Sequence, residues 1–272
     1  MSDVTLSTAS RQALTLLQRT SELRAQTTRR LATELKVSQV RDDPPAFFQA
    51  KALSDRARGL LAAKDDIGQA ASTVEASLVG LDAIEDLSRQ LKGIALSVKG
   101  ASAEARAAAA EQFDVLRQQI TNLANDAGLS GTNLIAASPS NLDVTVNETG
   151  SSQINISGQA ADAGGLGIGA AATFNNFASD SDIEAAVKQL DGVITQVRVQ
   201  AAGLGSSIAS LQVRDNFIKD LTNTLEDGAA KLVEADLNEE GARLLAVQLR
   251  QDLGIETLGV AQRSQGLIAE LL

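Results

Sequence analysis

The residues of this chain that could carry out chemistry are mainly carboxylates, which occur in three clusters. The clusters are Asp42 with Asp43, Asp82 with Glu85 and Asp86, and Glu239 with Glu240. Neighbouring carboxylates can act as general acid and base, or they can bind a metal ion. Such sites commonly include histidine, and this chain has no histidine and no cysteine. We therefore interpret the clusters as solvated or salt-bridged helix faces, and expect no catalytic residue, no metal site and no cofactor.

A glycine-rich run and a glycosylation sequon are the other two candidate sites. The run GGLGIG at Gly164–Gly169 lacks the Lys-Ser or Lys-Thr that follows a phosphate-binding loop, and it lacks the strand-to-helix context. The sequon at Asn147–Thr149 falls where a hairpin turn is expected, and such turns favour Asn and Thr in any case. We interpret both segments as surface turns.

Composition limits the function classes. Hydrophobic residues make up 44% of the 272, but aromatic residues make up only 2%, so the core must consist of Leu, Ile, Val and Ala. A net charge of -10 disfavours binding to nucleic acid or to an anionic membrane. No run approaches the ~18 apolar residues of a membrane span, and the N-terminus lacks a cleavable signal pattern. The chain is expected to be cytoplasmic, or exported by a route that reads no cleaved signal.

Apolar residues spaced by three and four predict long helices on either side of a polar centre. The predicted helices cover residues 6–35, 45–98, 103–127, 181–232 and 238–272. Between them, Leu142, Val144 and Val146 alternate with polar residues, as do Ile154 and Ile156, which predicts a β-hairpin. Because the two helical arms have similar lengths, the chain should fold back so that its ends lie side by side. The predicted fold class is mainly α: an antiparallel long-helix coiled-coil bundle with paired N- and C-terminal helices and one small β-hairpin.

The last predicted helix has two apolar stripes, which is one more than a helix needs to pack inside its own chain. We expect the first stripe to pack on the N-terminal helix and the second to pack on a neighbouring molecule. The first stripe comprises Leu245, Leu249, Leu253, Val260, Leu267 and Leu271, and the second comprises Leu244, Val247, Ile255 and Leu258. The partner helix contributes Leu16, Leu17, Leu23, Leu31 and Leu35, together with the basic residue Arg30.

Two motifs near the ends of the chain resemble those of bacterial flagellins of the short alphaproteobacterial type. RLATELKV at residues 30–37, followed by RDDP at 41–44, is similar to the family segment R-L-S-S-G-x-x-I and its K-D-D. ADLNEE at residues 235–240, followed by Gln248, Gln251 and Leu253-Gly254, is similar to the family C-terminus. The resemblance covers essentially the whole chain. One departure is Glu34, which stands where the family usually has Gly.

The resemblance implies a layered architecture. Residues 1–42 and 236–272 would form the terminal coiled coil of the inner filament core. Residues 43–140 and 181–235 would form a helical outer-core domain, to which the hairpin and glycine-rich loop at 141–180 belong. No large outer domain would fit in that segment. Asp42 and Asp43 would lie at the joint between the layers, so we count them with Arg30 and the stripe leucines as assembly residues.

The function implied by the resemblance is structural. The chain would be a subunit of the bacterial flagellar filament, exported unfolded through the type III channel and self-assembling into a hollow helical polymer for swimming motility. Its location would be the extracellular flagellum. Partners would be copies of itself, paralogous flagellins, the export apparatus, the filament cap and the hook–filament junction, with no nucleic acid and no membrane insertion. Two alternatives stay open: a hook–filament junction protein with the same end motifs, and a cytoplasmic coiled-coil adaptor. An enzyme is the weakest candidate.

Overall fold

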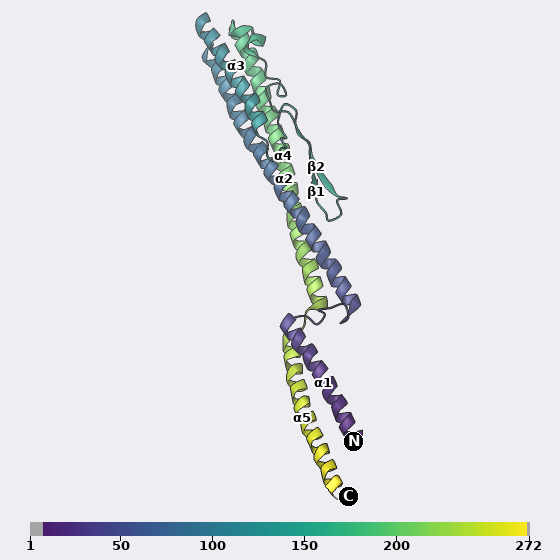
Figure 1. Ribbon diagram of the computed structural model, residues 1–272. Helices are drawn as coiled ribbons and strands as arrows, with labels where there is room; N and C mark the ends of the chain where they lie inside the picture. Colours follow the sequence, from purple (N-terminus) through teal and green to yellow (C-terminus); the bar gives the residue numbers. More distant parts are fainter. Residues whose placement is uncertain (1–7, 271–272) are drawn as a thin grey trace. The chain divides into compact units, whose positions relative to one another are not determined.

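The computed structural model describes residues 8–270, and it describes the side chains of all of these except residues 9, 261 and 265–270. All five predicted helices and the hairpin are present, so the fold class is confirmed (Figure 1). The helices are α1 (Thr8–Thr33), α2 (Pro44–Ser97), α3 (Ala103–Asp126), α4 (Asp180–Val233) and α5 (Leu237–Glu270). The strands are β1 (Leu142–Thr145) and β2 (Gln153–Ile156), and a short 3-10 helix, η1 (Ala171–Phe177), precedes α4.

The chain divides into two compact units. Unit 1 combines residues 1–55 with 224–272, so it contains α1, α5, the beginning of α2 and the end of α4. Unit 2 comprises residues 56–223 and contains the rest of α2 and α4 together with α3, the hairpin and η1. Unit 1 is formed by two segments from opposite ends of the sequence, whereas unit 2 is one continuous segment.

The polar link before α2 forms its own local structure. Two prolines at the start of α2 cannot continue a helix from upstream, but they are well tolerated in its first turn. Asp43 caps this turn, because its Oδ1 accepts a hydrogen bond from the N–H of Ala46 at 3.1 Å. The Asp42 carboxylate accepts the N–H groups of Ser38 and Gln39 at 3.1 and 3.0 Å. Both carboxylates of this pair therefore shape the link within the chain.

Unit 2 is built on an antiparallel pair of helices. Three ion pairs join α2 and the turn directly after it to α4: Glu85 with Arg198 at 2.7 Å, Lys92 with Asp191 at 2.6 Å, and Lys99 of the turn with Glu184 at 2.6 Å. Successive pairs step by seven residues up α2 and by seven residues down α4, which is the repeat of an antiparallel coiled coil. The seam between the helices is mainly apolar, although Ser77 and Ser88 of α2 are also buried. Its fully buried side chains include Val74, Leu81, Ile84 and Leu91 on α2, and Leu190, Leu211 and Ile218 on α4.

The hairpin and the third helix complete unit 2. β1 and β2 pair antiparallel in the register Leu142 with Ile156 through Thr145 with Gln153. Val144 and Ile156 are buried, and the hairpin turn is held to α2 by an ion pair between Arg56 and Glu148 at 2.7 Å. α3 buries Phe113, which stacks edge-on against Phe177 with the ring centroids 5.3 Å apart.

Candidate assembly surface

The paired terminal helices of unit 1 carry most of the predicted assembly residues. α1 and α5 lie side by side and run in opposite directions (Figure 1). The segments that join them to the rest of the chain are bonded to each other, since the N–H of Ala235 donates to the Glu34 carbonyl at 2.9 Å and that of Lys36 donates to the Val233 carbonyl at 2.8 Å. This bridge fixes where the two helices begin to pair.

The side chains that α1 buries against α5 are polar or small. Ser10, Thr20 and Thr27 are all less than 5% exposed. Positions 10, 13, 17, 20, 24, 27 and 31 follow alternating steps of three and four, so they occupy one face of the helix. Leu17 and Leu31 on this face are only half-buried. The hydroxyl of Thr20 is satisfied by the carbonyl of Leu16 at 2.8 Å, which allows it to be buried without a partner on α5.

Charged and amide groups cross this seam. Arg30 Nη1 lies 2.8 Å from Glu240 Oε1, and the Glu240 side chain is only 6% exposed. Further along, Arg24 Nη1 donates to Gln251 Oε1 at 3.1 Å. The second carboxylate oxygen of Glu240 is buried and has no hydrogen-bond partner among the described residues. A seam of this kind orients two helices but stabilises them weakly, since each buried charge loses much of its hydration free energy.

On α5 the predicted stripe assignment is wrong. Val247 of the second stripe is 3% exposed and faces α1, whereas Leu245 and Leu249 of the first stripe are 68% and 62% exposed. At 3.6 residues per turn, the first stripe lies on the face opposite the seam. Leu253 and Val260 share this exposed face. The error has a physical cause: we expected the stripe richest in leucine to be buried within the chain, but α1 presents a polar face to α5.

The remaining predicted residues divide between the seam and the surface. Leu244 and Leu258 are half-buried as the second stripe predicts, but Ile255 is 56% exposed. On α1, Leu16 and Leu23 are exposed, while Leu17, Leu31 and Leu35 are half-buried. The side chain of Leu267 and the whole of Leu271 lie outside the described residues.

Sequence reasoning missed Gly254 as a seam residue. It is buried, and a Cβ at this position would lie 2.9 Å from Leu17 Cδ2. Even the smallest added side chain would therefore push Leu17 away. The glycine lets α1 approach α5 closely where Leu17 lies opposite, and only its position relative to the seam could have revealed this role.

The outward leucines of α5 form a surface that no described residue covers. We define the α5 leucine stripe as Leu245, Leu249, Leu253 and Val260, all more than half exposed. Scattered exposed leucines are ordinary, but three leucines and a valine on one face of one helix form an apolar stripe of the kind that marks a protein interface, interrupted by the exposed Glu256. The described helices contain no span apolar and long enough to cross a membrane.

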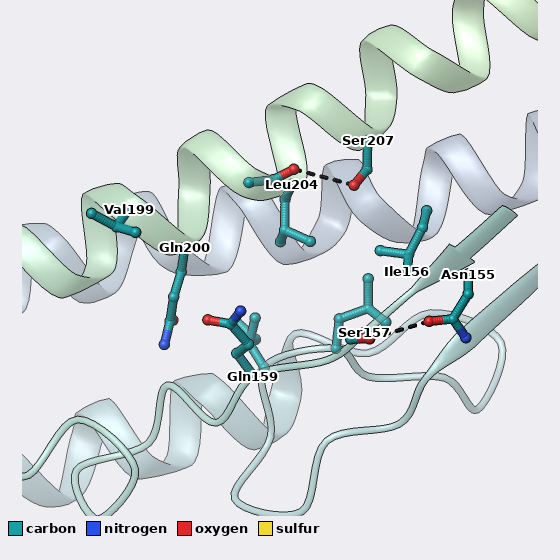
Figure 2. Close-up of a pocket in the computed structure, with 11 residues that line it drawn as sticks. Asn155, Ile156, Ser157, Gln159, Val199, Gln200, Leu204 and Ser207 are labelled. Atoms are coloured by element: carbon teal, nitrogen blue, oxygen red, sulfur yellow. Dashed lines mark hydrogen bonds between the residues drawn. The ribbon is translucent and has the colours of Figure 1, made fainter.

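The pocket drawn in Figure 2 lies between β2 and α4 in unit 2, with a cavity volume of about 220 Å³. Gln200 extends from α4 toward the Gln159 segment, and its Nε2 donates to the Ala160 carbonyl at 3.4 Å (Figure 2). Its Oε1 is buried without a partner among the described residues. The polar groups of the lining are carboxamides, hydroxyls and backbone groups, with no acid, base or cation. This pocket could accept a neutral polar group, but it lacks the pairing of nucleophile and base that hydrolytic chemistry needs.

The carboxylate clusters are engaged in pairing with arginine or in capping. Glu85 pairs with Arg198 and Arg89, and Asp86 pairs with Arg89 at 2.8 Å. Glu239 pairs with Arg243 at 2.8 Å. Among residues 8–270, no group of three or more potential ligand side chains is placed to hold a metal ion. The arrangement supports helix pairing and interface formation.

Comparisons with known proteins match this arrangement of helices. Residues 187–272 match the family model described as the bacterial flagellin C-terminal helical region. Flagellin FljM of Caulobacter vibrioides is 29% identical over 95% of this chain and 94% of its own length. The flagellin of Brucella melitensis is 25% identical over 100% of this chain and 99% of its own length. This chain is similar to bacterial flagellins over nearly its whole length. The match supports a structural subunit of the bacterial flagellar filament, a protein that functions as a polymer.

Other similar proteins indicate that such subunits occur in sets. Flagellins FljO and FljK of Caulobacter vibrioides are each 28% identical over 89% of this chain. Caulobacter vibrioides therefore has at least three flagellins that are similar to this chain. No specific observation favours the hook–filament junction protein over a filament subunit.

Proposed function

We propose that this chain polymerises by burying its α5 leucine stripe against the terminal helices of neighbouring copies. The observation that carries the proposal is the reversal of faces on α5, where Val247 is buried against α1 while Leu245 and Leu249 point away. Burying the exposed part of each of the four stripe side chains contributes roughly 1–2 kcal/mol. Several kcal/mol per subunit would then favour the polymer over the free chain.

The geometry of repeated contacts follows from this surface. The stripe belongs to α5 alone, and the surface that covers it on the next copy would be a different one. Such a contact is heterologous, and repeating it produces an open helical polymer. In that polymer residues 1–42 and 236–272 would form the inner layer around a channel. Residues 43–140 and 181–235, with the hairpin and loop at 141–180, would form the layer outside it.

The weak seam suggests how export and assembly are linked. With polar residues buried between α1 and α5 and leucines exposed, the isolated pair gains little from folding. We propose that the pair is poorly ordered in the free chain, that the chain passes unfolded through the type III export apparatus, and that the pair folds as neighbours cover it. Circular dichroism tests this step, since helicity should rise on polymerisation; equal helicity in free chain and filament would contradict it.

The filament environment supplies the other proposed partners. Paralogous flagellins with the same terminal helices could share a filament with this chain. The filament cap would receive each new subunit, and the hook–filament junction would receive the first. The site of action would be the extracellular filament.

Charge placed on the stripe tests the proposal. Leu249→Glu with Leu253→Glu should abolish filament formation, because neighbouring copies would have to bury unpaired carboxylates. The matched control is Val79→Glu, at an equally exposed residue whose α2 face already has Glu75 and Asp82 nearby. Filaments are scored by sedimentation and electron microscopy after seeding. Normal polymerisation of the double variant, or equal loss in the control, would show that the stripe is not the assembly surface.

A further inference from the structure

A pocket in unit 2 that shares no residue with the α5 leucine stripe has the features of a binding site for a small molecule. We define the β2/α4 pocket by its lining residues, 134–135, 155–157, 159, 199–200, 203–204 and 207. Its volume of about 220 Å³ has room for about seven water molecules at about 30 Å³ each. Packing gaps inside proteins are seldom larger than one water molecule, so this pocket is large enough for a ligand.

The floor of the β2/α4 pocket is apolar. Ile135, Ile156 and Leu204 line it and are 2%, 3% and 8% exposed. A buried water molecule needs several polar partners, and these three side chains offer none. Water in this part of the pocket is therefore weakly held, and an apolar ring that displaces it gains free energy.

One polar side chain of the pocket has a hydrogen-bonding group without a partner. Gln200 is 8% exposed, and its Nε2 donates to the Ala160 carbonyl at 3.4 Å. This contact fixes the orientation of the carboxamide, because the reverse orientation would bring two acceptor oxygens together. The other end is Oε1, which is buried and accepts no hydrogen bond from the described residues. A buried acceptor without a donor is unfavourable, so a ligand that donates to it would be favoured.

The Gln200 carboxamide can turn toward a ligand at little cost. Its contact with Ala160 is at the long end of hydrogen-bond distances, and the last torsion of a glutamine side chain is soft. Gln159 lines the same pocket from the facing loop and is exposed (Figure 2). It offers a second carboxamide, which has both donors and an acceptor. The two glutamines together suit a primary amide, because Gln200 can accept its N–H and Gln159 can donate to its carbonyl.

Ionised ligands do not suit this pocket. All of its lining residues lie in the described part of the chain, and none of them is an acid or a base. A carboxylate or an ammonium group bound there would lose its hydration without gaining a partner of opposite charge. The ligand that fits this lining is therefore uncharged.

We propose that the β2/α4 pocket binds a small uncharged molecule that carries a primary amide on an apolar ring. Oε1 of Gln200 accepts an amide N–H, and the ring lies against Ile135, Ile156 and Leu204. This inference goes beyond the proposed function, because polymerisation through the α5 leucine stripe requires no ligand. Failure of either proposal would leave the other intact.

Benzamide is a suitable probe, because it joins a primary amide to an apolar ring. It is titrated into the full, unpolymerised chain, and binding is followed by the NMR signals of the methyl groups. The expected result is a saturable shift of the Ile135, Ile156 and Leu204 methyl signals. If benzamide causes no saturable shift of these signals, the pocket holds only water and the proposal is wrong.

Two probes of similar shape separate amide recognition from simple apolar binding. Benzoate has a carboxylate in place of the amide, and N,N-dimethylbenzamide has no N–H. Each should bind about tenfold more weakly than benzamide, because each lacks a neutral donor for Gln200 Oε1. Equal binding of all three probes would contradict recognition of the amide.

Gln200→Leu removes the acceptor but keeps an apolar side chain of similar size. Benzamide should bind this variant about tenfold more weakly, whereas the affinity for N,N-dimethylbenzamide should stay the same. Circular dichroism checks that the variant is folded. Equal weakening of both probes would show that Gln200 only shapes the pocket, and would overturn its assignment as the acceptor.

Gly203 allows the pocket to be filled without disturbing the fold. The α4 residues that line the pocket share one face of the helix at 3.6 residues per turn, and Gly203 lies in the middle of that face. A Cβ added there would meet no atom within 4 Å. Gly203→Leu should therefore occupy the pocket and abolish the benzamide shifts, while leucine favours the helix more than glycine does.

The matched control is Gly192→Leu, at another α4 glycine where an added Cβ meets no atom within 4 Å but which does not line the pocket. This variant should bind benzamide as the natural chain does. Unchanged benzamide binding by Gly203→Leu would place the probe elsewhere on the molecule and overturn the proposal. Equal loss in the two leucine variants would also overturn it, because the effect would then not depend on filling the pocket.

Discussion

The two antiparallel helix pairs of this chain differ in what they bury. Between α2 and α4 in unit 2, the seam is mainly leucine, isoleucine and valine, with Ser77 and Ser88 buried among them, and charged residues form ion pairs along its edge. Between α1 and α5 in unit 1, the seam includes Ser10, Thr20, Thr27 and Glu240, and the leucines of α5 are exposed. The first pair satisfies its hydrophobic surface within the chain. The second leaves that surface for other molecules, so the difference separates a self-sufficient unit from one completed by assembly.

The largest expected effect tests the self-sufficient unit. Leu91→Ala on α2 removes a fully buried side chain from the apolar seam. It should lower the free energy of unfolding of unit 2 by about 2–5 kcal/mol, because it leaves a cavity that the helices cannot fill. Denaturant unfolding followed by circular dichroism measures the change.

The matched substitution in the other unit is Leu249→Ala on α5. In the free chain it should change stability by less than about 0.5 kcal/mol, because the side chain is mostly exposed there. Its effect should appear in the polymer, as a raised concentration of unassembled subunit. If the alanine variants at 91 and 249 destabilise the free chain equally, the two helix pairs do not differ as described.

The polar seam of unit 1 gives the next largest effect. Arg30→Met removes the ion-pair partner of the buried Glu240 carboxylate, which keeps a weaker contact to Arg243 at 3.5 Å. The filament should melt more easily, by about 1–3 kcal/mol per subunit, because a buried acceptor loses its donor. Adding Glu240→Met should restore most of the loss, since replacing both charges by apolar groups removes the desolvation cost.

Filament melting temperature, followed by light scattering, measures this effect. The double variant also distinguishes the possible roles of the pair. If the pair serves only stability, the double variant should assemble as well as the natural chain. If it also orients α5, the double variant should be stable but should assemble into less regular filaments. A Glu240→Met, Arg30→Met variant as unstable as Arg30→Met alone would contradict the assignment of the cost to an unpaired carboxylate.

Relieving the backbone strain at Glu34 should have a smaller effect, which is a gain in stability. Its φ of 60° lies in the left-handed region, which a non-glycine residue occupies at a cost. The family usually has glycine at this position, which fits the observed backbone. Glu34→Gly should therefore stabilise the joint by about 1 kcal/mol, even though glycine has more freedom when unfolded. Thr33→Gly, inside α1, is the control and should destabilise. A loss of filament stability in both variants would show that Glu34 has a contact that outweighs its strain.

The elements of this fold were predictable from the sequence, and the facing of the terminal helices was not. Repeats of three and four residues mark every long helix, and the alternation around Val144 and Ile154 marks the hairpin. These patterns depend only on neighbouring residues in the sequence, so they can be detected without knowing what each helix packs against. Which stripe of α5 faces α1 depends instead on the surface that α1 presents, and its buried residues are Ser10, Thr20 and Thr27. A polar seam has no hydrophobic periodicity to detect. Leucines that pack on a neighbouring copy have the same helical spacing as leucines buried in a core.

The candidate site was predictable to a similar degree. The stripe leucines were identified as assembly residues, and that role stays a prediction. Arg30, Asp42 and Asp43 were grouped with them, and the structure gives each of the three a contact within the chain. Gly254 could not be found from composition, because its role depends on Leu17 lying opposite.

The smallest expected effect is a change in the stability of unit 2 at low pH. The N–H of Gly100 and the guanidinium of Arg106 hold the pKa of Asp180 below its usual value of 3.8, and hydrogen bonds from Ser179 lower that of Asp182. A carboxyl with a lowered folded-state pKa binds fewer protons in the folded state than in the unfolded chain. The contribution of such a carboxylate to the stability of unit 2 is therefore complete above about pH 4, and it is lost as pH falls through the folded-state pKa.

Asp180→Asn tests this expectation in unit 2. The variant should unfold at a lower temperature than the natural chain near neutral pH, and the difference should shrink toward pH 2. Asp82→Asn, on the exposed acidic face of α2, is the control and should show no such convergence. Because unit 2 draws its stability from an apolar seam, the natural chain should keep most of its helicity at pH 3. Wholesale loss of helicity there would mean that ion pairs, more than buried leucines, hold α2 to α4.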